Sequence, residues 1–298
     1  MYEDFVPALD PDAFHAALYT GVIARFRETD AMRAITAFTR DFLEERFAPH
    51  APIEIHRHFP PAPLAERIAA TQRDYSRAEE AKRLWRALFE TIGLDPATIA
   101  RDRLMVRFQP PLADEWHRST ATVGFHRDSW GTNLYAQVNW WAPVYPITAE
   151  RTFAFFPGLW ARPLANSSRD FDMAEAMRRV REAPASLKPG DMVPRLLEPV
   201  DPGEGVPVTI APGEIIAFSG QHAHAGVPNH TGLTRISLET RTLAIADHLA
   251  RRGARNVDGR AYWMAPGLFR RASDATPLPT LLGCRPLEPF AGPWPLDP

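Results

Sequence analysis

Residues 234–242 read TRISLETRT, so that isoleucine and leucine alternate there with arginine, serine and glutamate. Side chains two positions apart lie on the same face of a strand, and this pattern therefore predicts a strand with one apolar and one polar face. The same alternation runs through residues 103–109 (RLMVRFQ) and 137–141 (QVNWW). The polar faces either meet solvent or line the polar interior of a barrel, and the alternation fits both.

Further short segments of strand character follow one another from about residue 103. They are rich in β-branched and aromatic residues and are separated by turn signals, such as the Pro-Gly pair of an expected type II turn at 211–214. Besides 234–242, the segments that predict strands are 103–109, 133–141 (NLYAQVNWW), 152–156 (TFAFF) and 214–219 (EIIAFS).

The first hundred residues show mostly apolar side chains at helical spacings, which predicts helices. Three are expected, the first running from Asp10-Pro11 through Phe26, the second over 32–47, and the third opening at Ser76 with Glu79 in the capping-box position. Between them, residues 53–56 (IEIH) alternate and predict a short strand. Helices followed by a run of short strands indicate an α+β fold, with one β-sandwich or barrel and helices packed on the outer face of its sheet.

We expect the 298 residues to form a single domain. Its mainly helical part covers 1–100, and its β core covers 101–245 with a helical excursion at about 166–194. A C-terminal helix and a Pro-rich tail occupy 246–298. The excursion is a candidate lid over the site, because an active site that makes reactive species must exclude water.

The composition excludes several classes of function. A formal net charge of −2 and a pI of about 6.6 argue against nucleic-acid and polybasic membrane partners. The single cysteine, Cys284, excludes a disulfide framework and a cysteine-cluster metal site. Without an apolar run of about 20 residues or a signal-peptide pattern at its start, the sequence predicts a cytoplasmic protein. The oligomeric state stays open.

The residues that carry chemistry begin with Gly124-Phe-His-Arg-Asp128. His126 and Asp128 are two apart, so an extended chain projects an imidazole and a carboxylate to the same side. Two imidazoles and one carboxylate can hold a divalent metal ion and leave one of its faces open. Taken alone, the pair fits a surface ion pair better than a metal site.

A second histidine segment, QHAHAGVPN, occupies residues 221–229, directly after an expected strand. His222 and His224 are both candidates for the third ligand, because residues two apart point the same way along a strand. Arg235 lies eleven residues beyond His224, and Ser237 shares its strand face.

The three elements His126-x-Asp128, HAGVPN at 224–229 and Arg235-x-Ser237 resemble the phytanoyl-CoA dioxygenase family of non-haem iron oxygenases. The resemblance covers about residues 100–245. It implies a double-stranded β-helix (a cupin-like jelly roll) with Fe(II), the co-substrate 2-oxoglutarate and dioxygen. The implied reaction is hydroxylation of a small molecule, with specialised metabolism as a candidate setting, and with release of succinate and CO2.

The resemblance also implies a role for individual residues. It selects His224 over His222, so that His126, Asp128 and His224 hold the iron. Arg235, backed by Ser237, would bind the distal carboxylate of 2-oxoglutarate. Gln137 and Asn139 share the face of the site and either contact 2-oxoglutarate or the substrate, or belong to a solvated face. The residues expected to face the substrate are Arg107, Trp141, His222 and Arg241, although Arg241 could instead pair with a carboxylate.

Two departures from the family pattern concern the substrate. Pro157-Gly158 lacks the Ser-His that follows in many members, and Trp140-Trp141 replaces the usual aliphatic residues. Phytanoyl-CoA is therefore not expected as the substrate. The intact Asp128 argues against a halogenase, because halide needs the position that the carboxylate fills. Two alternatives remain, a cupin-type metalloenzyme of another class (an isomerase or a hydrolase) and a non-catalytic jelly roll that binds a small molecule.

Overall fold

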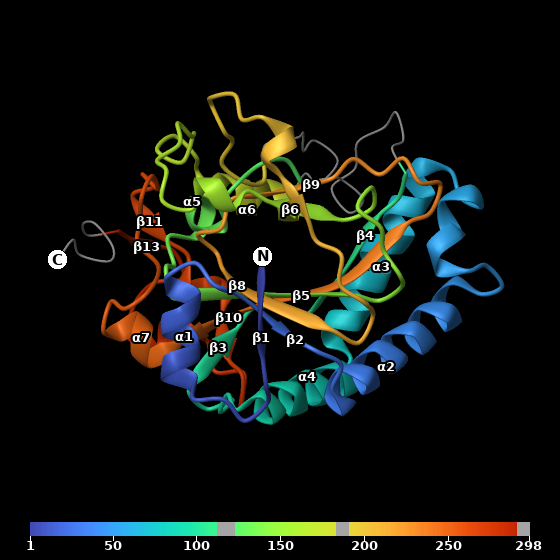
Figure 1. Cartoon of the computed structure of the whole chain (residues 1–298), viewed down its shortest axis with the longest axis horizontal. Helices are drawn as coiled ribbons and strands as arrows, with labels where there is room; N and C mark the ends of the chain where they lie inside the picture. Colours follow the sequence, from blue (N-terminus) through green and yellow to red (C-terminus); the bar gives the residue numbers. More distant parts are fainter. Residues whose placement is uncertain (112–122, 183–190, 291–298) are drawn as a thin grey trace.

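The computed structural model describes residues 1–111, 123–182 and 191–290, and its main feature is an eight-stranded sheet that crosses the molecule (Figure 1). The strands run in the order β1-β2-β8-β5-β10-β3-β12, and β4 also pairs with β10. Apart from the parallel pair β1–β2, the pairings in this sheet are antiparallel. The bounds are β1 (Tyr2–Phe5), β2 (Ile23–Phe26), β3 (Ile99–Arg101), β4 (Met105–Gln109), β5 (Gln137–Pro143), β8 (Ile215–Ser219), β10 (Arg235–Ala244) and β12 (Arg270–Arg271).

A three-stranded sheet packs against one face of the large sheet. It consists, in the order β7-β6-β9, of β7 (Val206–Pro207), β6 (Phe153–Phe155) and β9 (His224–Gly226). Trp141 and Phe218 from the large sheet pack with Phe153 and Phe155 from the small one in a buried cluster. A separate pair is formed by β11 (Trp263–Met264) and β13 (Glu288–Pro289).

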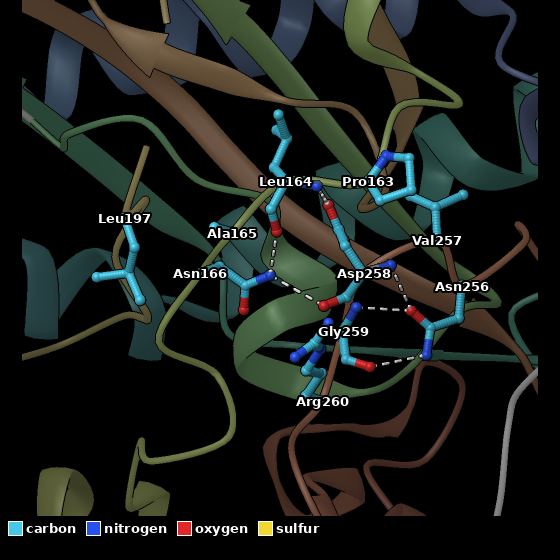
Figure 2. Close-up of a pocket in the computed structure, with 10 residues that line it drawn as sticks. All are labelled: Pro163, Leu164, Ala165, Asn166, Leu197, Asn256, Val257, Asp258, Gly259 and Arg260. Atoms are coloured by element: carbon cyan, nitrogen blue, oxygen red, sulfur yellow. Dashed lines mark hydrogen bonds between the residues drawn. The ribbon is translucent and has the colours of Figure 1, made fainter. Parts of the chain in front are cut away.

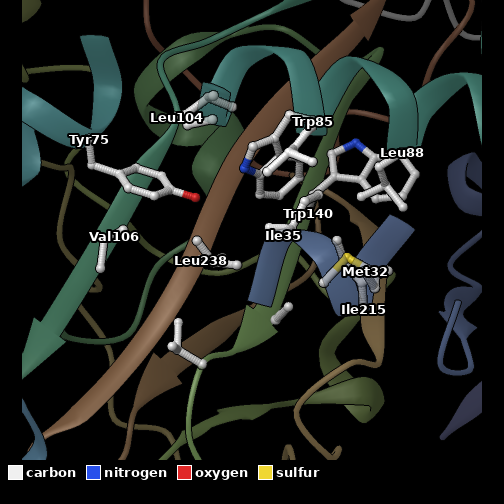
Figure 3. Packing of buried hydrophobic residues seen from close by; sticks show 14 of the residues in the cluster. Met32, Ile35, Tyr75, Trp85, Leu88, Leu104, Val106, Trp140, Ile215 and Leu238 are labelled. Atoms are coloured by element: carbon white, nitrogen blue, oxygen red, sulfur yellow. The ribbon is translucent and has the colours of Figure 1, made fainter. Parts of the chain in front are cut away.

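Helices from the N-terminal part cover the other face of the large sheet. Trp140 of β5, Val106 of β4 and Leu238 of β10 belong to one buried cluster with Trp85 and Leu88 of α4 (Figure 3). The predicted apolar strand faces therefore turn outward, toward these helices. The helices of this part are α1 (Pro11–Tyr19), α2 (Asp30–Phe47), α3 (Pro61–Arg77) and α4 (Glu79–Ile92).

The polar faces of the same strands point the opposite way, into the interior. Gln137 and Ser237 are fully buried, and Arg235 is 5% exposed. Of the two interpretations of the alternation, the structure thus selects the polar interior over the solvated face. The chain has a mixed fold of helices and a large sheet, and the double-stranded β-helix stays a prediction.

Local structure near the N-terminus differs from the prediction at residue 19. The expected helix through Phe26 ends at Tyr19, and the chain continues as strand β2. Gly21 adopts a left-handed φ of +102° between the two elements, a conformation that glycine reaches without steric cost. The apolar spacing continues across this turn because strand β2 buries Phe26, as a helix would have done.

Two further boundaries also differ. Residues 53–56 lie in the 3-10 helix η1 (Pro52–Arg57) instead of a strand, with Pro52 at its first position and Ile55 buried against the helices. Ser76 lies in the last turn of α3, and α4 begins after Ala78 without a side-chain cap. By contrast, the turn at 211–214 is present, with Gly213 at a φ of +97°.

The C-terminal half supplies shorter helices. The expected excursion contains α6, which begins at Met173, and residues 183–190 of it lie outside the described residues. No helix in the described ranges is long and apolar enough to cross a membrane. The remaining elements are α5 (Asp128–Thr132), η2 (Pro157–Leu159), α6 (Met173–Glu182), η4 (Pro202–Glu204), α7 (Ile245–Leu249), η5 (Pro266–Leu268) and α8 (Leu278–Leu282). Of the expected Pro-rich tail, residues 291–298 also lie outside the described part.

Candidate metal centre

The two histidine segments meet at an isolated antiparallel bridge. The backbone N–H of His126 donates to the carbonyl of His224, and the N–H of His224 donates to the carbonyl of His126, both at 3.0 Å. This pairing places the two imidazole rings 4.3 Å apart between centroids. Asp128, the first residue of α5, completes the group. The structure thus brings together the three predicted ligands from segments almost one hundred residues apart.

The three donor groups are spaced for a single ion. Nε2 of His126 lies 4.0 Å from Oδ1 of Asp128, and Nε2 of His224 lies 3.9 Å from its Oδ2. One ligand atom from each residue lies within 4.8 Å of the others. Two donors that are each about 2.1 Å from one ion are at most about 4.2 Å apart. Each of the two measured separations lies within that limit, one through Oδ1 and the other through Oδ2.

Backbone carbonyls determine which nitrogen of each imidazole is available. Nδ1 of His126 is 2.8 Å from the carbonyl of Gly124, and Nδ1 of His224 is 3.0 Å from the carbonyl of His222. A carbonyl only accepts, so each Nδ1 carries the proton and donates it. Nε2 is left with its lone pair toward the other ligands, as metal-binding histidines require.

The charge states suit a cation at this position. Burial, aided by the neighbouring His224, lowers the pKa of His126 to about 4, so its imidazole is neutral near pH 7. Burial alone would raise the pKa of Asp128. However, His224, His126, Arg241 and the amide of Asn139 together hold it below its usual range. Two imidazoles and one carboxylate are the donor types of a facial triad for a divalent metal.

Gln137 and Asn139 lie beside Asp128 on strand β5. The side-chain amide of Asn139 donates to Oδ2 of Asp128 at 2.5 Å, and the amide of Gln137 donates to Oδ1 of Asn139 at 2.8 Å. Both side chains therefore face the metal centre, as expected, and their immediate partner is a ligand residue. A contact with 2-oxoglutarate or substrate stays a prediction for both.

Arg235 offers a candidate anion site at the start of β10. Its guanidinium is buried, and neither Nε nor Nη1 has a hydrogen-bond partner among the described residues. Burial lowers its pKa to about 10, so it stays charged near neutral pH. Arg235 pairs in register with Gln109, whose amide donates to the carbonyl of Val227, three residues after His224.

Glu239 alters the surroundings that were expected for Arg235 and Ser237. The Ser237 hydroxyl donates to Oε1 of Glu239 at 3.0 Å, and Nε of Arg107 lies 2.8 Å from Oε2. Ser237 is thus engaged by a carboxylate of the chain, and its role in binding 2-oxoglutarate stays a prediction. The charge of Arg107 is likewise balanced by its ion pair with Glu239.

The remaining predicted site residues occupy three different settings. Arg241 pairs with Asp102 through Nε at 2.9 Å, and its Nη1 lies 4.0 Å from Oδ1 of Asp128. Trp141 is buried between the two sheets, 5.1 Å from Phe153 in an edge-to-face contact. His222 packs 4.5 Å from the ring of Trp160, and burial lowers its pKa to about 3. The described metal-binding group includes His224 and not His222.

Arg127 is a residue that the sequence reasoning missed. It is fully buried, donates to the carbonyls of Leu159 and Gln221 at 2.6 Å each, and pairs with Asp258 at 3.1 Å. The sequence predicted no role for it. Glu239 could have been found from the sequence, because it shares a strand face with Arg235. By contrast, no local pattern indicates that Arg127 pairs with Asp258.

A pocket of about 470 Å³ is lined by 163–166, Leu197 and 256–260, and none of the predicted site residues belongs to it (Figure 2). The carboxylate of Asp258 accepts hydrogen bonds from the N–H of Leu164 at 3.1 Å and from Nε1 of Trp130 at 2.7 Å. Asp258 of the pocket wall therefore holds α5, the helix that begins at Asp128, through its hydrogen bond with Trp130.

Comparison with known proteins gives distant likenesses only. No protein-family model matches the chain, and no curated protein matches it. Among solved structures it is similar to EvdO2 from Micromonospora carbonacea var. aurantiaca (14% identity, 81% of this chain and 94% of that one, TM-score 0.45), which is also known in complex with 2-oxoglutarate. It is also similar to the epimerase SnoN in complex with Fe3+, alpha ketoglutarate and nogalamycin RO (13% identity, 97% of each chain, TM-score 0.40). A third similar structure is AviO1 from Streptomyces viridochromogenes Tue57 (16% identity, 79% of this chain and 95% of that one, TM-score 0.38). With every TM-score below 0.5, the function must be inferred from the chain's own residues.

Proposed function

We propose that this chain is a non-haem Fe(II)- and 2-oxoglutarate-dependent oxygenase that hydroxylates a small molecule. The observation that carries the proposal is the combination of a partly buried His126–Asp128–His224 group with the buried Arg235, two of whose donor atoms have no partner among the described residues. The group supplies the ligand types for Fe(II), and Arg235 supplies a cation for a dicarboxylate co-substrate. Iron with a bound 2-oxo acid supplies the activation of dioxygen for oxidation of a substrate carbon.

The protein residues prepare the metal site in advance. The carbonyls of Gly124 and His222 orient the two imidazoles, so no proton has to leave Nε2 when the ion binds. A single carboxylate and two histidines leave other positions of the ion open for a co-substrate. The buried phenylalanine cluster next to His224, with Phe153 and Phe218 within 6.1 Å of each other, excludes water from one side of the site.

Arg235 would orient the co-substrate by pairing with its distal carboxylate. A guanidinium binds a carboxylate through two parallel hydrogen bonds, from Nε with Nη2 or from Nη1 with Nη2, and both Nε and Nη1 lack a partner among the described residues. Burial strengthens such a pair because it removes competing water. The Ser237 hydroxyl would also donate a hydrogen bond to this carboxylate, after turning away from Glu239.

The test is an anaerobic titration of the apoprotein with Fe(II), with and without 2-oxoglutarate, followed by visible absorption. We expect a charge-transfer band only when both are present, and release of succinate once oxygen is admitted. His224→Ala should abolish the band, whereas the matched His230→Ala should keep it. Metal binding without the band would refute the proposal and favour an isomerase or hydrolase. Ligand binding without metal would favour a non-catalytic binding protein.

A further inference from the structure

The carboxylate of Asp128 has two oxygens in unlike surroundings. Oδ2 accepts the hydrogen bond from the Asn139 amide at 2.5 Å. Oδ1 has no hydrogen bond to any described residue, and the imidazole Nε2 of His126 and the guanidinium Nη1 of Arg241 each lie 4.0 Å from it. Arg241 is itself held by Asp102, so it does not close onto Oδ1. One oxygen is therefore engaged by the protein and the other is free.

Asn139 is held in its orientation by a chain of hydrogen bonds. A carboxylate only accepts, so Asn139 must turn its NH2 group to Asp128 and its oxygen to a donor. That donor is the NH2 group of Gln137 at 2.8 Å, and the oxygen of Gln137 accepts from the Thr132 hydroxyl at 3.1 Å. Each amide along the chain has only one orientation that satisfies both of its ends.

The surroundings leave water no place in this chain. Gln137, Thr132 and Asn139 are all buried, at 0%, 2% and 6% exposure. A Cβ at Gly220 would lie 3.0 Å from Nε2 of Gln137 and 3.3 Å from Cβ of Asp128, so a larger residue there would press on both side chains. Thr132 belongs to α5, and its single hydroxyl proton has two alternative acceptors, the oxygen of Gln137 at 3.1 Å and the carbonyl of Asp128 at 3.2 Å.

We propose that Asn139, held by Gln137 and Thr132, is a positioning residue that presents Asp128 to the metal as a one-oxygen ligand. It occupies Oδ2, which leaves Oδ1 for the ion and keeps the carboxylate from chelating through both oxygens. The inference rests on the proposed metal site and gives Asn139 a function other than contact with the co-substrate. Partners of metal ligands commonly change metal affinity about 10–100-fold when they are removed.

Three variants test the chain by metal binding alone, without turnover. Asn139→Leu removes the amide at nearly constant volume, and Gln137→Met removes its support. Thr242→Val is the matched control, because Thr242 accepts a buried hydrogen bond from Trp140 on the opposite face of the sheet. Affinity for Fe(II) and Co(II) is measured by anaerobic competition with a chelator, and the visible spectrum of the Co(II) protein reports the coordination.

We expect Asn139→Leu to lower the affinity for both ions about 10–100-fold and to change the Co(II) spectrum. Gln137→Met should have the same effects to a smaller extent. Because Gln137 acts through Asn139, the double variant should be no weaker than Asn139→Leu alone. Thr242→Val should lower the melting temperature and leave affinity and spectrum unchanged.

Wild-type affinity and spectrum in both single variants, with the fold retained, would overturn the positioning role and leave the proposed oxygenase intact. Additive losses in the double variant would overturn the chain through Gln137. A wild-type protein that binds neither ion would refute the metal site and the positioning role together. If one variant fails to fold, the other still decides the role.

Discussion

Replacing Arg235 by methionine should weaken 2-oxoglutarate binding without destabilising the protein. The side chain is 5% exposed, and Nε and Nη1 have no hydrogen-bond partner among the described residues. A buried donor without a partner is a cost to the folded state, which the co-substrate would remove. Methionine fills much of the same volume and carries no donor.

The magnitude follows from the two hydrogen bonds of one bidentate arginine–carboxylate pair. A hydrogen bond between charged groups contributes about 1.5–3 kcal/mol, so two such bonds amount to about 3–6 kcal/mol. Since about 1.4 kcal/mol corresponds to a factor of ten, the affinity should fall about 10²–10⁴-fold. Arg235→Lys keeps the charge and loses the paired geometry, and an intermediate loss is expected. The free energy of unfolding of the apoprotein should stay equal or rise, because two unpaired buried donors disappear.

The assay is calorimetric titration of 2-oxoglutarate into the anaerobic Fe(II) protein and its Arg235 variants, with Fe(II) affinity and chemical unfolding measured in parallel. An unchanged 2-oxoglutarate affinity would refute the role of Arg235. An equal loss of Fe(II) affinity would show that the substitution disturbs the metal site instead. A large loss of stability would contradict the conclusion that the two donors are unpaired.

Further predictions concern the histidines and one turn. His224→Ala should abolish Fe(II) binding, while His222→Ala should retain most of it, because His222 packs on Trp160 and lies outside the metal-binding group. The stability of the apoprotein should fall as the pH drops below about 6.5, since burial lowers the pKa of His222 to about 3 and that of His248 to about 4. The unfolded chain then binds protons that the folded chain does not, which costs up to about 1.4 kcal/mol per pH unit for each histidine. Gly213→Ala should lower the free energy of unfolding by about 1–2 kcal/mol, because φ is +97° there and a Cβ would meet the Glu28 side chain at 3.1 Å.

Each of these predictions has its own control. The reverse result for the two histidines would make His222 the ligand. Chemical unfolding between pH 4 and 7 measures the pH dependence, which His248→Gln should flatten, and a profile that is already flat in the wild type would contradict it. For Gly213→Ala, Gly158→Ala is the comparison, because a Cβ there meets nothing within 4 Å and the φ is not left-handed. Equal melting temperatures for the two would show that the turn is not strained.

Sequence periodicity was sufficient where a strand has two unlike faces. The alternation in 103–109, 137–141 and 234–242 predicted β4, β5 and β10, because period two is a local property of an extended chain. It was not sufficient at 53–56 or at Ser76, where packing against neighbouring helices decides the boundary. The left-handed turn at Gly21 also interrupts a pattern that reads as one helix.

The sequence by itself determined which residue types are available for the site and that three of them could hold a divalent metal. Only the tertiary structure decided that the backbone of His126 pairs with that of His224, which excludes His222 from the group. It also decided that Asn139 binds Asp128 and that Glu239 engages Ser237 and Arg107. The physical reason is that these contacts join segments far apart in the chain, and a local pattern shows which face a side chain takes but not which partner it meets there.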